Sequence, residues 1–274
     1  MFLRGVTAAA VALCCAAPLA RAADSTPLSE QAAAKVAAAE RPLSAELGGD
    51  GRRTTGRFIP NLGRNIAGVF ARENLGSLLV GAGFTGVAFT LDDGTQRVVK
   101  DKADDLGEFG QSAGSMRTIA PLTLGAFLAG RASTDSRFRA ASYDIAQATI
   151  VTGLYTDLLK RTVGRTRPDA SDTRSFPSGH TSNAFAWARV ASHHYGKRVG
   201  IPAYALAGFI GVSRLERNKH HLSDVVAGAT IGLIVGRTVA REDSEPVRRE
   251  KRFSIVPMTD AQGGGVGAGV SIQF

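Results

Sequence analysis

Cysteine is nearly absent from this sequence of 274 residues, and its two copies, Cys14 and Cys15, both lie near the start. The segment Met1–Ala22 has an early positive charge at Arg4, continues as an apolar run and ends in a small-residue Ala-Arg-Ala site. This pattern is typical of a secretory signal peptide, so we expect cleavage after about Ala22 and export to the cell envelope, into the periplasm. Without this segment the chain has no cysteine. That excludes disulfides, a thiol nucleophile and a thiolate metal site.

Long apolar runs are also scarce. The mean hydropathy is near zero, and the apolar runs are shorter than the ~20 residues that a membrane-spanning helix needs. Polar side chains such as Gln147 and Asp157 interrupt several of them. We therefore expect the helices to be core helices of a bundle, and only Leu78–Leu91 and Val225–Val239 could insert into a bilayer.

Acidic residues are outnumbered, with 24 Asp and Glu against 33 Lys and Arg, so the formal net charge is +9. This excess suits an anionic substrate or an anionic membrane surface. No aromatic-interleaved basic patch accompanies it, so nucleic acid is not an expected partner. The carboxylates do not cluster as a two-metal site requires, and no glycine-rich phosphate loop occurs, so we expect no metal and no other cofactor.

Apolar residues recur at helical spacing through the middle of the chain, whereas residues 23–57 show little such periodicity. We interpret 23–57 as a flexible tether and 58–241 as one all-α domain, a helical bundle of about six helices. The triplet Asp92–Gly94 predicts a turn, and residues 92–112 a loop or short surface helices. The six helices are expected at about 61–91, 117–130, 141–165, 177–195, 202–212 and 222–241.

The final segment, 242–274, has a different pattern. A charged stretch comes first, and from Val266 to Phe274 apolar residues alternate with glycine and polar residues. Alternation of this kind is strand periodicity with one apolar face. We predict a charged linker followed by a short C-terminal β-hairpin.

One stretch with chemical potential runs from Ser213 to Asp224. A helix predicted from about His220 would place His220 and Asp224 one turn apart on one face. The carboxylate could then accept the Nδ1–H of the imidazole and leave Nε2 unprotonated, as a histidine nucleophile requires. Arg214, just before that helix, could bind two oxygens of a phosphate. A surface His–Asp pair beside a solvated arginine is the simpler alternative.

Two cations precede this stretch in the chain. Lys160 and Arg167 stand seven residues apart near the end of a predicted helix that Pro168 stops. Both could project from one face, with no nearby acid to pair with, and could hold a dianionic phosphate. An ordinary basic helix end would have the same pattern.

The tetrapeptide from Pro177 to His180 predicts the start of a helix, with Pro177 at its first position. The N–H groups of Ser178 and Gly179 would lie in the first turn, which is an anion-binding geometry. His180 beside them could protonate a leaving oxygen. The alternative is a capped helix start with an incidental histidine.

Together the three stretches resemble the type 2 phosphatidic acid phosphatase / vanadium haloperoxidase superfamily. Its pattern is K-x6-R-P, then P-S-G-H, then S-R-x5-H-x3-D, and the resemblance covers about residues 65–241. The matching positions, in the correct order and spacing, are Lys160, Arg167, Pro168, Pro177, Ser178, Gly179, His180, Ser213, Arg214, His220 and Asp224.

The resemblance implies a metal-free phosphatase on a helical bundle. His220 would attack phosphorus in line to form a phosphohistidine, with Asp224 orienting it. His180 would protonate the leaving group and then activate water. The phosphate-binding groups would be Lys160, Arg167, Arg214 and the backbone amides of Ser178 and Gly179.

The expected substrate is a phosphate monoester or diphosphate of a lipid, such as phosphatidate, phosphatidylglycerol phosphate or a polyprenyl diphosphate, met at a membrane surface. A soluble periplasmic acid phosphatase of broad specificity is one alternative, which the short apolar runs favour. A vanadium-dependent haloperoxidase on the same anion site is another, although the short spacing between Pro168 and Pro177 disfavours it. A catalytically silent envelope module is the alternative without enzyme activity.

Overall fold

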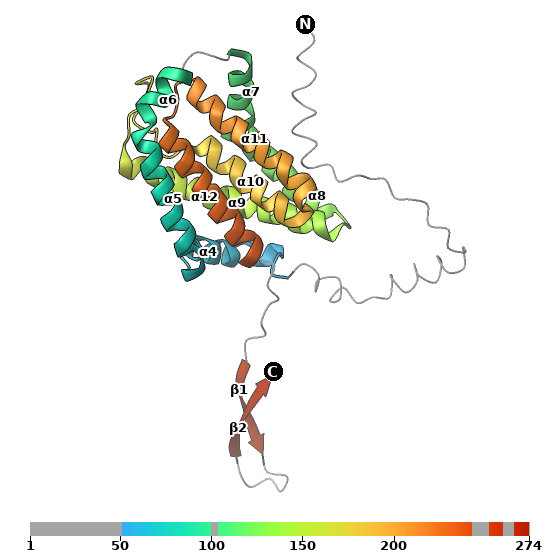
Figure 1. Ribbon diagram of the computed structural model, residues 1–274. Coiled ribbons are helices and arrows are strands. Elements are labelled where there is room, and N and C mark those ends of the chain that lie inside the picture. The colour runs from blue at the N-terminus through green and yellow to red at the C-terminus, as the bar shows by residue number, and fades with distance from the viewer. Residues whose placement is uncertain (1–50, 100–103, 243–251, 260–265, 274) are drawn as a thin grey trace, which may run out of the picture.

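The computed structural model describes residues 51–99, 104–242, 252–259 and 266–273, so the expected signal peptide and most of the expected tether lie outside the described residues. The described part is predominantly α-helical, as predicted, and its helices form one bundle (Figure 1). The helical elements are η1 (Thr55–Arg57), α4 (Phe58–Gly68), α5 (Arg72–Thr90), α6 (Asp92–Val99), α7 (Asp104–Gly114), α8 (Met116–Ala132), α9 (Ser136–Val163), α10 (Gly179–Tyr195), α11 (Lys197–Glu216) and α12 (Leu222–Glu242).

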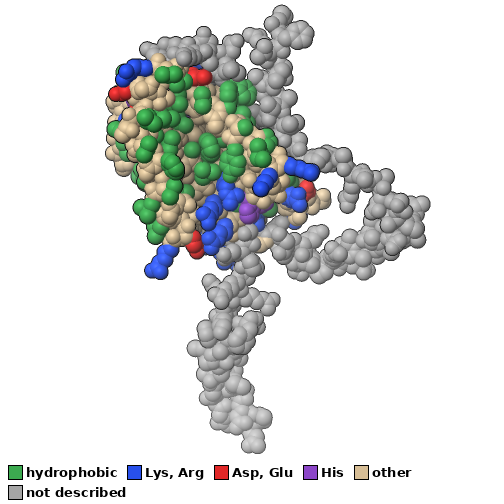
Figure 2. All heavy atoms as spheres, in the orientation of Figure 1, with side chains coloured by type: hydrophobic (Ala, Val, Ile, Leu, Met, Phe, Trp, Pro, Cys, Tyr) green, Lys and Arg blue, Asp and Glu red, His purple; other side chains and the backbone are tan. Residues whose placement is uncertain are grey.

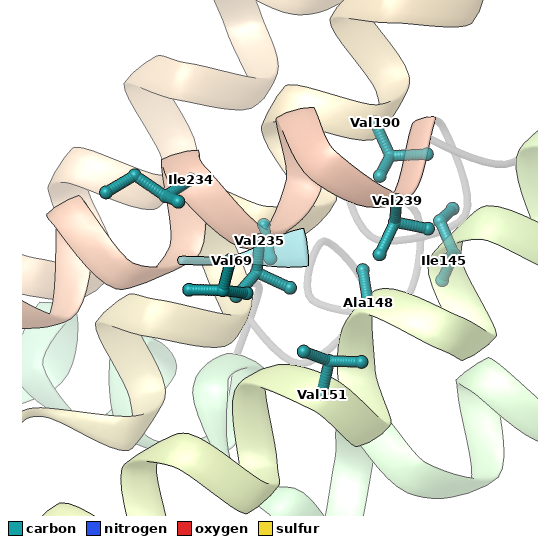
Figure 3. Close-up of a cluster of buried hydrophobic side chains, with 9 residues drawn as sticks. Val69, Ile145, Ala148, Val151, Val190, Ile234, Val235 and Val239 are labelled. Atoms are coloured by element: carbon teal, nitrogen blue, oxygen red, sulfur yellow. The ribbon is translucent and has the colours of Figure 1, made fainter. Parts of the chain in front are cut away.

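The core lies where α9, α10 and α12 pack together (Figure 3). Val151, Val190 and Val235 are fully buried there. Three glycines of α12, Gly228, Gly232 and Gly236, allow its close approach to α10; a Cβ at Gly232, for example, would lie 2.2 Å from the Ser182 carbonyl oxygen. Small residues at these positions bring together the two helices whose N-terminal ends carry His180 and Asp224.

The predicted number of six helices is wrong, because the described residues form nine α-helices. The first expected helix is divided into α4 and α5 at Ala71, whose backbone is extended. Asn74 stabilises this break, since its side-chain amide donates to the Gly68 carbonyl at the end of α4 (2.9 Å) and to the Thr238 hydroxyl (2.9 Å).

The segment expected to be a loop or short helices contains the other two additional helices, α6 and α7. The predicted turn at Asp92–Gly94 is wrong, because these residues open α6. Two aspartates in the first turn favour a helix start through the helix dipole. Asp92 also accepts the Ser223 backbone N–H (2.8 Å), so that long-range bond holds α6 against the start of α12.

Two strands follow the bundle in the chain, β1 (Arg252–Thr259) and β2 (Val266–Gln273). They pair antiparallel, with Arg252 opposite Gln273 and Thr259 opposite Val266.

A large apolar surface covers the outside of the bundle. Exposed hydrophobic residues include Leu79 (73%) and Phe84 (64%) of α5 and Leu128 (59%) of α8. Figure 2 shows such side chains spread over the face that α5, α11 and α12 present. Among the described helices, one is long and apolar enough to cross a membrane, Leu222–Arg241, and α5 with α6 would form a second candidate bent by 63°. These two candidates contain the apolar runs Leu78–Leu91 and Val225–Val239, which the sequence indicated could insert into a bilayer. Helix α12 is largely a core helix, whereas α5 exposes its apolar side chains.

Candidate active site

The predicted site residues come together at one end of the bundle. Lys160 lies near the end of α9, His180 in the first turn of α10, Arg214 in the last turn of α11 and Asp224 in the first turn of α12. His220 lies among them, and its pKa is lowered in part by the positive charges of Lys160, Arg214 and Arg167. Three sequence motifs, spread over 65 residues from Lys160 to Asp224, therefore form one cluster.

The His220–Asp224 pair is present, but its geometry differs from the one predicted. Helix α12 begins at Leu222, so His220 precedes the helix instead of lying on its face. The His220 Nδ1 is 3.6 Å from the Asp224 Oδ2, slightly longer than a hydrogen bond. The same oxygen accepts the His221 backbone N–H (2.8 Å), as an acidic residue in a first helical turn often does for the start of its own helix.

The Asp224 carboxylate is held by residues that the sequence did not reveal. Arg165 donates from Nη1 to Asp224 Oδ1 (2.9 Å), and the Ser175 hydroxyl donates to Oδ2. The other Arg165 nitrogen, Nη2, donates to Asp92 (2.7 Å), which links α6 to the site. Nothing in the neighbouring sequence indicated these roles. Arg165 looked like an ordinary basic residue at a helix end, and Asp92 lies 131 residues from Ser223, whose backbone N–H it accepts.

The two cations of the first motif do not share a helix face as predicted. Gly164 ends α9 in the left-handed conformation (φ 60°), so Arg167 lies in the following loop. The expectation that no acid pairs with them is also wrong, since Arg167 Nε donates to Asp172 (2.6 Å). Lys160 Nζ donates to the Arg174 carbonyl (2.6 Å) of the same loop.

Arg214 is the most unusual group of the cluster. It is 4% exposed, and its hydrogen bond to a side chain is a long one, from Nη1 to Gln111 of α7 (3.4 Å). Its Nε has no hydrogen-bond partner, and within the described ranges no carboxylate forms an ion pair with it. A buried guanidinium without a counter-ion is destabilising, so this position favours an anionic ligand.

Ser178 and Gly179 lie at the start of α10, close to where they were predicted. Ser178 is the N-cap, so Pro177 precedes the helix instead of occupying its first position. The Ser178 backbone N–H donates to the Asp224 backbone carbonyl (2.9 Å). This hydrogen bond would have to break before the N–H could bind a phosphate, as predicted. Gly179 packs close to Thr156 of α9, because a Cβ placed on Gly179 would lie 3.3 Å from the Thr156 Cγ2.

His180 is positioned by α7, a helix in the segment where the sequence predicts a loop or short helices. Its ring is hydrogen-bonded to the Gln111 backbone, and its Nε2 is buried without a partner. A Cβ at Gly114 would lie 2.8 Å from the His180 Cδ2, so only glycine allows the ring its place. Helix α7 therefore forms a wall of the site.

Burial, together with the positive surroundings, keeps both histidines neutral. Burial, followed by the Arg214 charge, lowers the pKa of His180 to about 3. Burial also lowers the pKa of His220 to about 4, against the opposing effect of Asp224. The pKa of Lys160 falls to about 8 through burial and the nearby Arg167 charge. At neutral pH the site thus offers neutral imidazoles beside cationic groups.

The fold and site define a class: a helical bundle whose helix ends assemble an anion site with two histidines. Residues 143–243, from α9 to α12, match the model of the PAP2 superfamily. This match agrees with the resemblance that the three motifs carry, and the matched segment holds every predicted site residue.

Curated relatives match parts of the chain. A lipid A 1-phosphatase of Porphyromonas gingivalis is 44% identical over 80 residues, which are 28% of this chain and 18% of that protein. Lipid phosphate phosphatase 2 of Arabidopsis thaliana is 31% identical over 129 residues, covering 31% of this chain and 44% of the relative. The chain thus spans less than half the length of either relative.

A solved structure shows the same fold. The transmembrane PAP2 type phosphatidylglycerolphosphate phosphatase from Bacillus subtilis aligns with a TM-score of 0.51 and 22% identity, covering 68% of this chain and 98% of that one.

Proposed function

We propose that this protein hydrolyses a phosphate monoester or diphosphate of a lipid, without a metal ion, through a phosphohistidine intermediate. The observation that carries the proposal is Arg214, which is buried and has no carboxylate partner among the residues that the structure describes. Together with Lys160 and Arg167 it provides a positive site beside a neutral imidazole, His220. A phosphate dianion would supply the missing counter-charge.

In the first step the His220 Nε2 lone pair attacks phosphorus, and the bond between phosphorus and the leaving oxygen breaks. Asp224 faces Nδ1 and stabilises the positive charge that develops on the ring. Lys160, Arg167 and Arg214 stabilise the equatorial oxygens, where negative charge accumulates in the transition state.

His180 transfers the protons. It gives a proton to the leaving oxygen, and in the second step it takes one from the water that attacks phosphohistidine. That attack breaks the N–P bond, releases phosphate and returns His220 to its neutral form. His180 must be protonated to begin. Burial and then the Arg214 charge lower its pKa, and a bound dianion would raise it by offsetting the Arg214 charge.

The apolar surface supports a lipid as the leaving group. Leu79 and Phe84 of α5 are exposed, and α5 adjoins α6, whose Asp92 reaches the site through Arg165. The bundle would meet a bilayer with this face, in the exported location that the sequence predicts. The matched relatives are named as phosphatases of lipid A and of lipid phosphates, which agrees with this substrate class.

The test compares phosphate release from phosphatidate and from para-nitrophenyl phosphate, in membrane and soluble fractions, in the presence of EDTA. We expect activity in the membrane fraction that prefers the lipid, resists EDTA and is inhibited competitively by vanadate. His220→Ala should abolish it, whereas His193→Ala, at the other end of α10, should not. Activity confined to the soluble fraction and to the small ester would favour a broad acid phosphatase, and metal dependence would contradict the proposed chemistry.

A further inference from the structure

A second cavity lies apart from the cluster of histidines and cations. It is a groove of about 550 Å³ between α5 and α11, with α10 and α12 as its floor. Helices α5 and α12 run antiparallel, since Glu73 contacts Arg241 at one end and Asp92 contacts Ser223 at the other. The groove opens along the middle of this pair, so it is a site of its own.

The walls of the groove are apolar and open. Val80 and Phe84 of α5 and Leu233 of α12 line it, and the two α5 side chains are 59% and 64% exposed. A Cβ placed on Gly76 would have no atom within 4 Å, so the wall is also hollowed at this position. A hydrocarbon chain could lie against these side chains and remove them from water.

One end of the groove is basic. Arg189 of α10 and Arg237 of α12 both line it. In the part of the chain that the structure describes, no carboxylate pairs with either arginine, whereas Arg241, one turn further along α12, contacts Glu73 at 3.2 Å. Arg237 is 13 residues from Asp224, about 20 Å along the helix, so this charge does not belong to the reaction site. Figure 2 shows Lys and Arg side chains gathered at the lower end of the apolar face.

We propose that this groove binds an anionic glycerophospholipid whose phosphate is a diester, such as phosphatidylglycerol. The head-group phosphate would contact Arg189 and Arg237, and one acyl chain would run past Val80 and Phe84 toward the catalytic end. Basic pockets between helices at a membrane recognise anionic lipid head groups in this way. Such a lipid carries a phosphodiester and no terminal phosphate, so it would be a bound component of the protein and not its substrate.

The test measures binding of phosphatidylglycerol and of phosphatidylcholine with the same acyl chains to the full chain in dodecyl maltoside, by native mass spectrometry. Phosphatidylglycerol should bind about tenfold more tightly or better, because Arg189 and Arg237 would face a head group of net negative charge, whereas the choline cation offsets the phosphate charge of phosphatidylcholine. The double variant Arg189→Gln/Arg237→Gln should lose this preference. Arg137→Gln, which removes an exposed arginine outside the groove, should keep it.

A steric variant provides an independent test. Gly76→Leu fills the hollow and should weaken the binding of both lipids, whereas Gly83→Leu, on the same helix but outside the groove lining, should not. Thermal unfolding of each variant shows that it is folded, without reference to any enzymatic activity. Equal affinity for the two lipids, or phosphatidylglycerol binding that survives both the double variant and Gly76→Leu, would overturn the proposal.

Discussion

The bundle contains two buried clusters built from the same three residue types, one at each end of α10. At the catalytic end Arg165 contacts Asp224 (2.9 Å), and His220 lies 3.6 Å from that carboxylate. At the other end Arg53 contacts Asp144 through two hydrogen bonds (2.7 and 2.8 Å), and the His194 Nε2 is 2.7 Å from the same carboxylate.

The difference lies in what surrounds each arginine–aspartate–histidine group. The Asp144 carboxylate is paired on both oxygens, and the Arg53 guanidinium also donates to the Ala240 carbonyl (3.1 Å). That cluster attaches the segment before η1 to α9 and α12. His220 instead faces three cations, of which Arg214 is buried and has no counter-ion within the described part of the chain. We propose that the additional charge of Arg214, and not the arginine–aspartate–histidine combination, distinguishes the proposed reactive site from the structural cluster.

The largest expected effect is the difference in kcat between variants of His220 and His194. His220→Ala should lower kcat by about 1,000-fold or more, because it removes the group that forms the intermediate. His194→Ala should leave kcat within about twofold and lower the unfolding free energy by about 1–2 kcal/mol, the magnitude of one lost buried hydrogen bond. Steady-state kinetics and denaturant titration of both variants measure this. A large kcat loss in His194→Ala would break the distinction.

The two arginines should show a similar contrast. Arg53→Gln leaves Asp144 buried with its charge uncompensated, so the unfolding free energy should fall by about 3–5 kcal/mol. Arg214→Gln should leave stability unchanged or raise it, because it removes an unpaired buried charge, while kcat/KM falls about 100-fold. Destabilisation of Arg214→Gln as large as that of Arg53→Gln would mean that Arg214 is structural.

Asp92 should act through Arg165 and position Asp224. We expect Asp92→Asn to lower kcat about tenfold with little change in KM. The rise of kcat/KM on the acid side of its pH profile should move to lower pH in this variant. Arg165 would then offset the Asp224 charge more fully, which disfavours protonated His220. Asp93→Asn, at an exposed neighbouring position, is the matched control. Equal behaviour of the two variants would argue against this link.

The smallest effect concerns pH. In the free enzyme, kcat/KM should rise as the pH increases through about 4, the pKa of His220, because deprotonation creates the nucleophile. At higher pH it should fall twice: first as His180 loses the proton that it gives to the leaving oxygen, and again above about 8, the pKa of Lys160, because a neutral amine binds the phosphate less strongly. Lys160→Arg should remove that alkaline decline, since arginine stays charged. If kcat/KM of Lys160→Arg still declines above about pH 8, the decline is due to another group.

The sequence predicted the members of the site better than their geometry. The spacing of the three motifs identified Lys160, Arg214 and His220, because those residues lie near helix ends that the bundle brings together. It could not predict that His220 precedes α12 or that Arg167 leaves α9, since the helix ends depend on caps formed after folding, such as the bond from Asp224 to the His221 N–H.

The additional helices were missed for a related reason. Helix α6 is short and charged, and it is held by the contact of Asp92 with Ser223, 131 residues away. Helix α7 supplies Gln111 to both Arg214 and His180, and no local periodicity marks that role. Long-range contacts of this kind have no signature in the neighbouring sequence.

The most direct test of the central claim is to trap the intermediate. The protein is mixed with a ³²P-labelled lipid phosphate, quenched in alkali within milliseconds, digested and sequenced by mass spectrometry. The account predicts acid-labile phosphate on the peptide that contains His220, and no labelled peptide in His220→Ala. Phosphate release at the full rate with no label on His220 would contradict it, and would indicate direct attack by water.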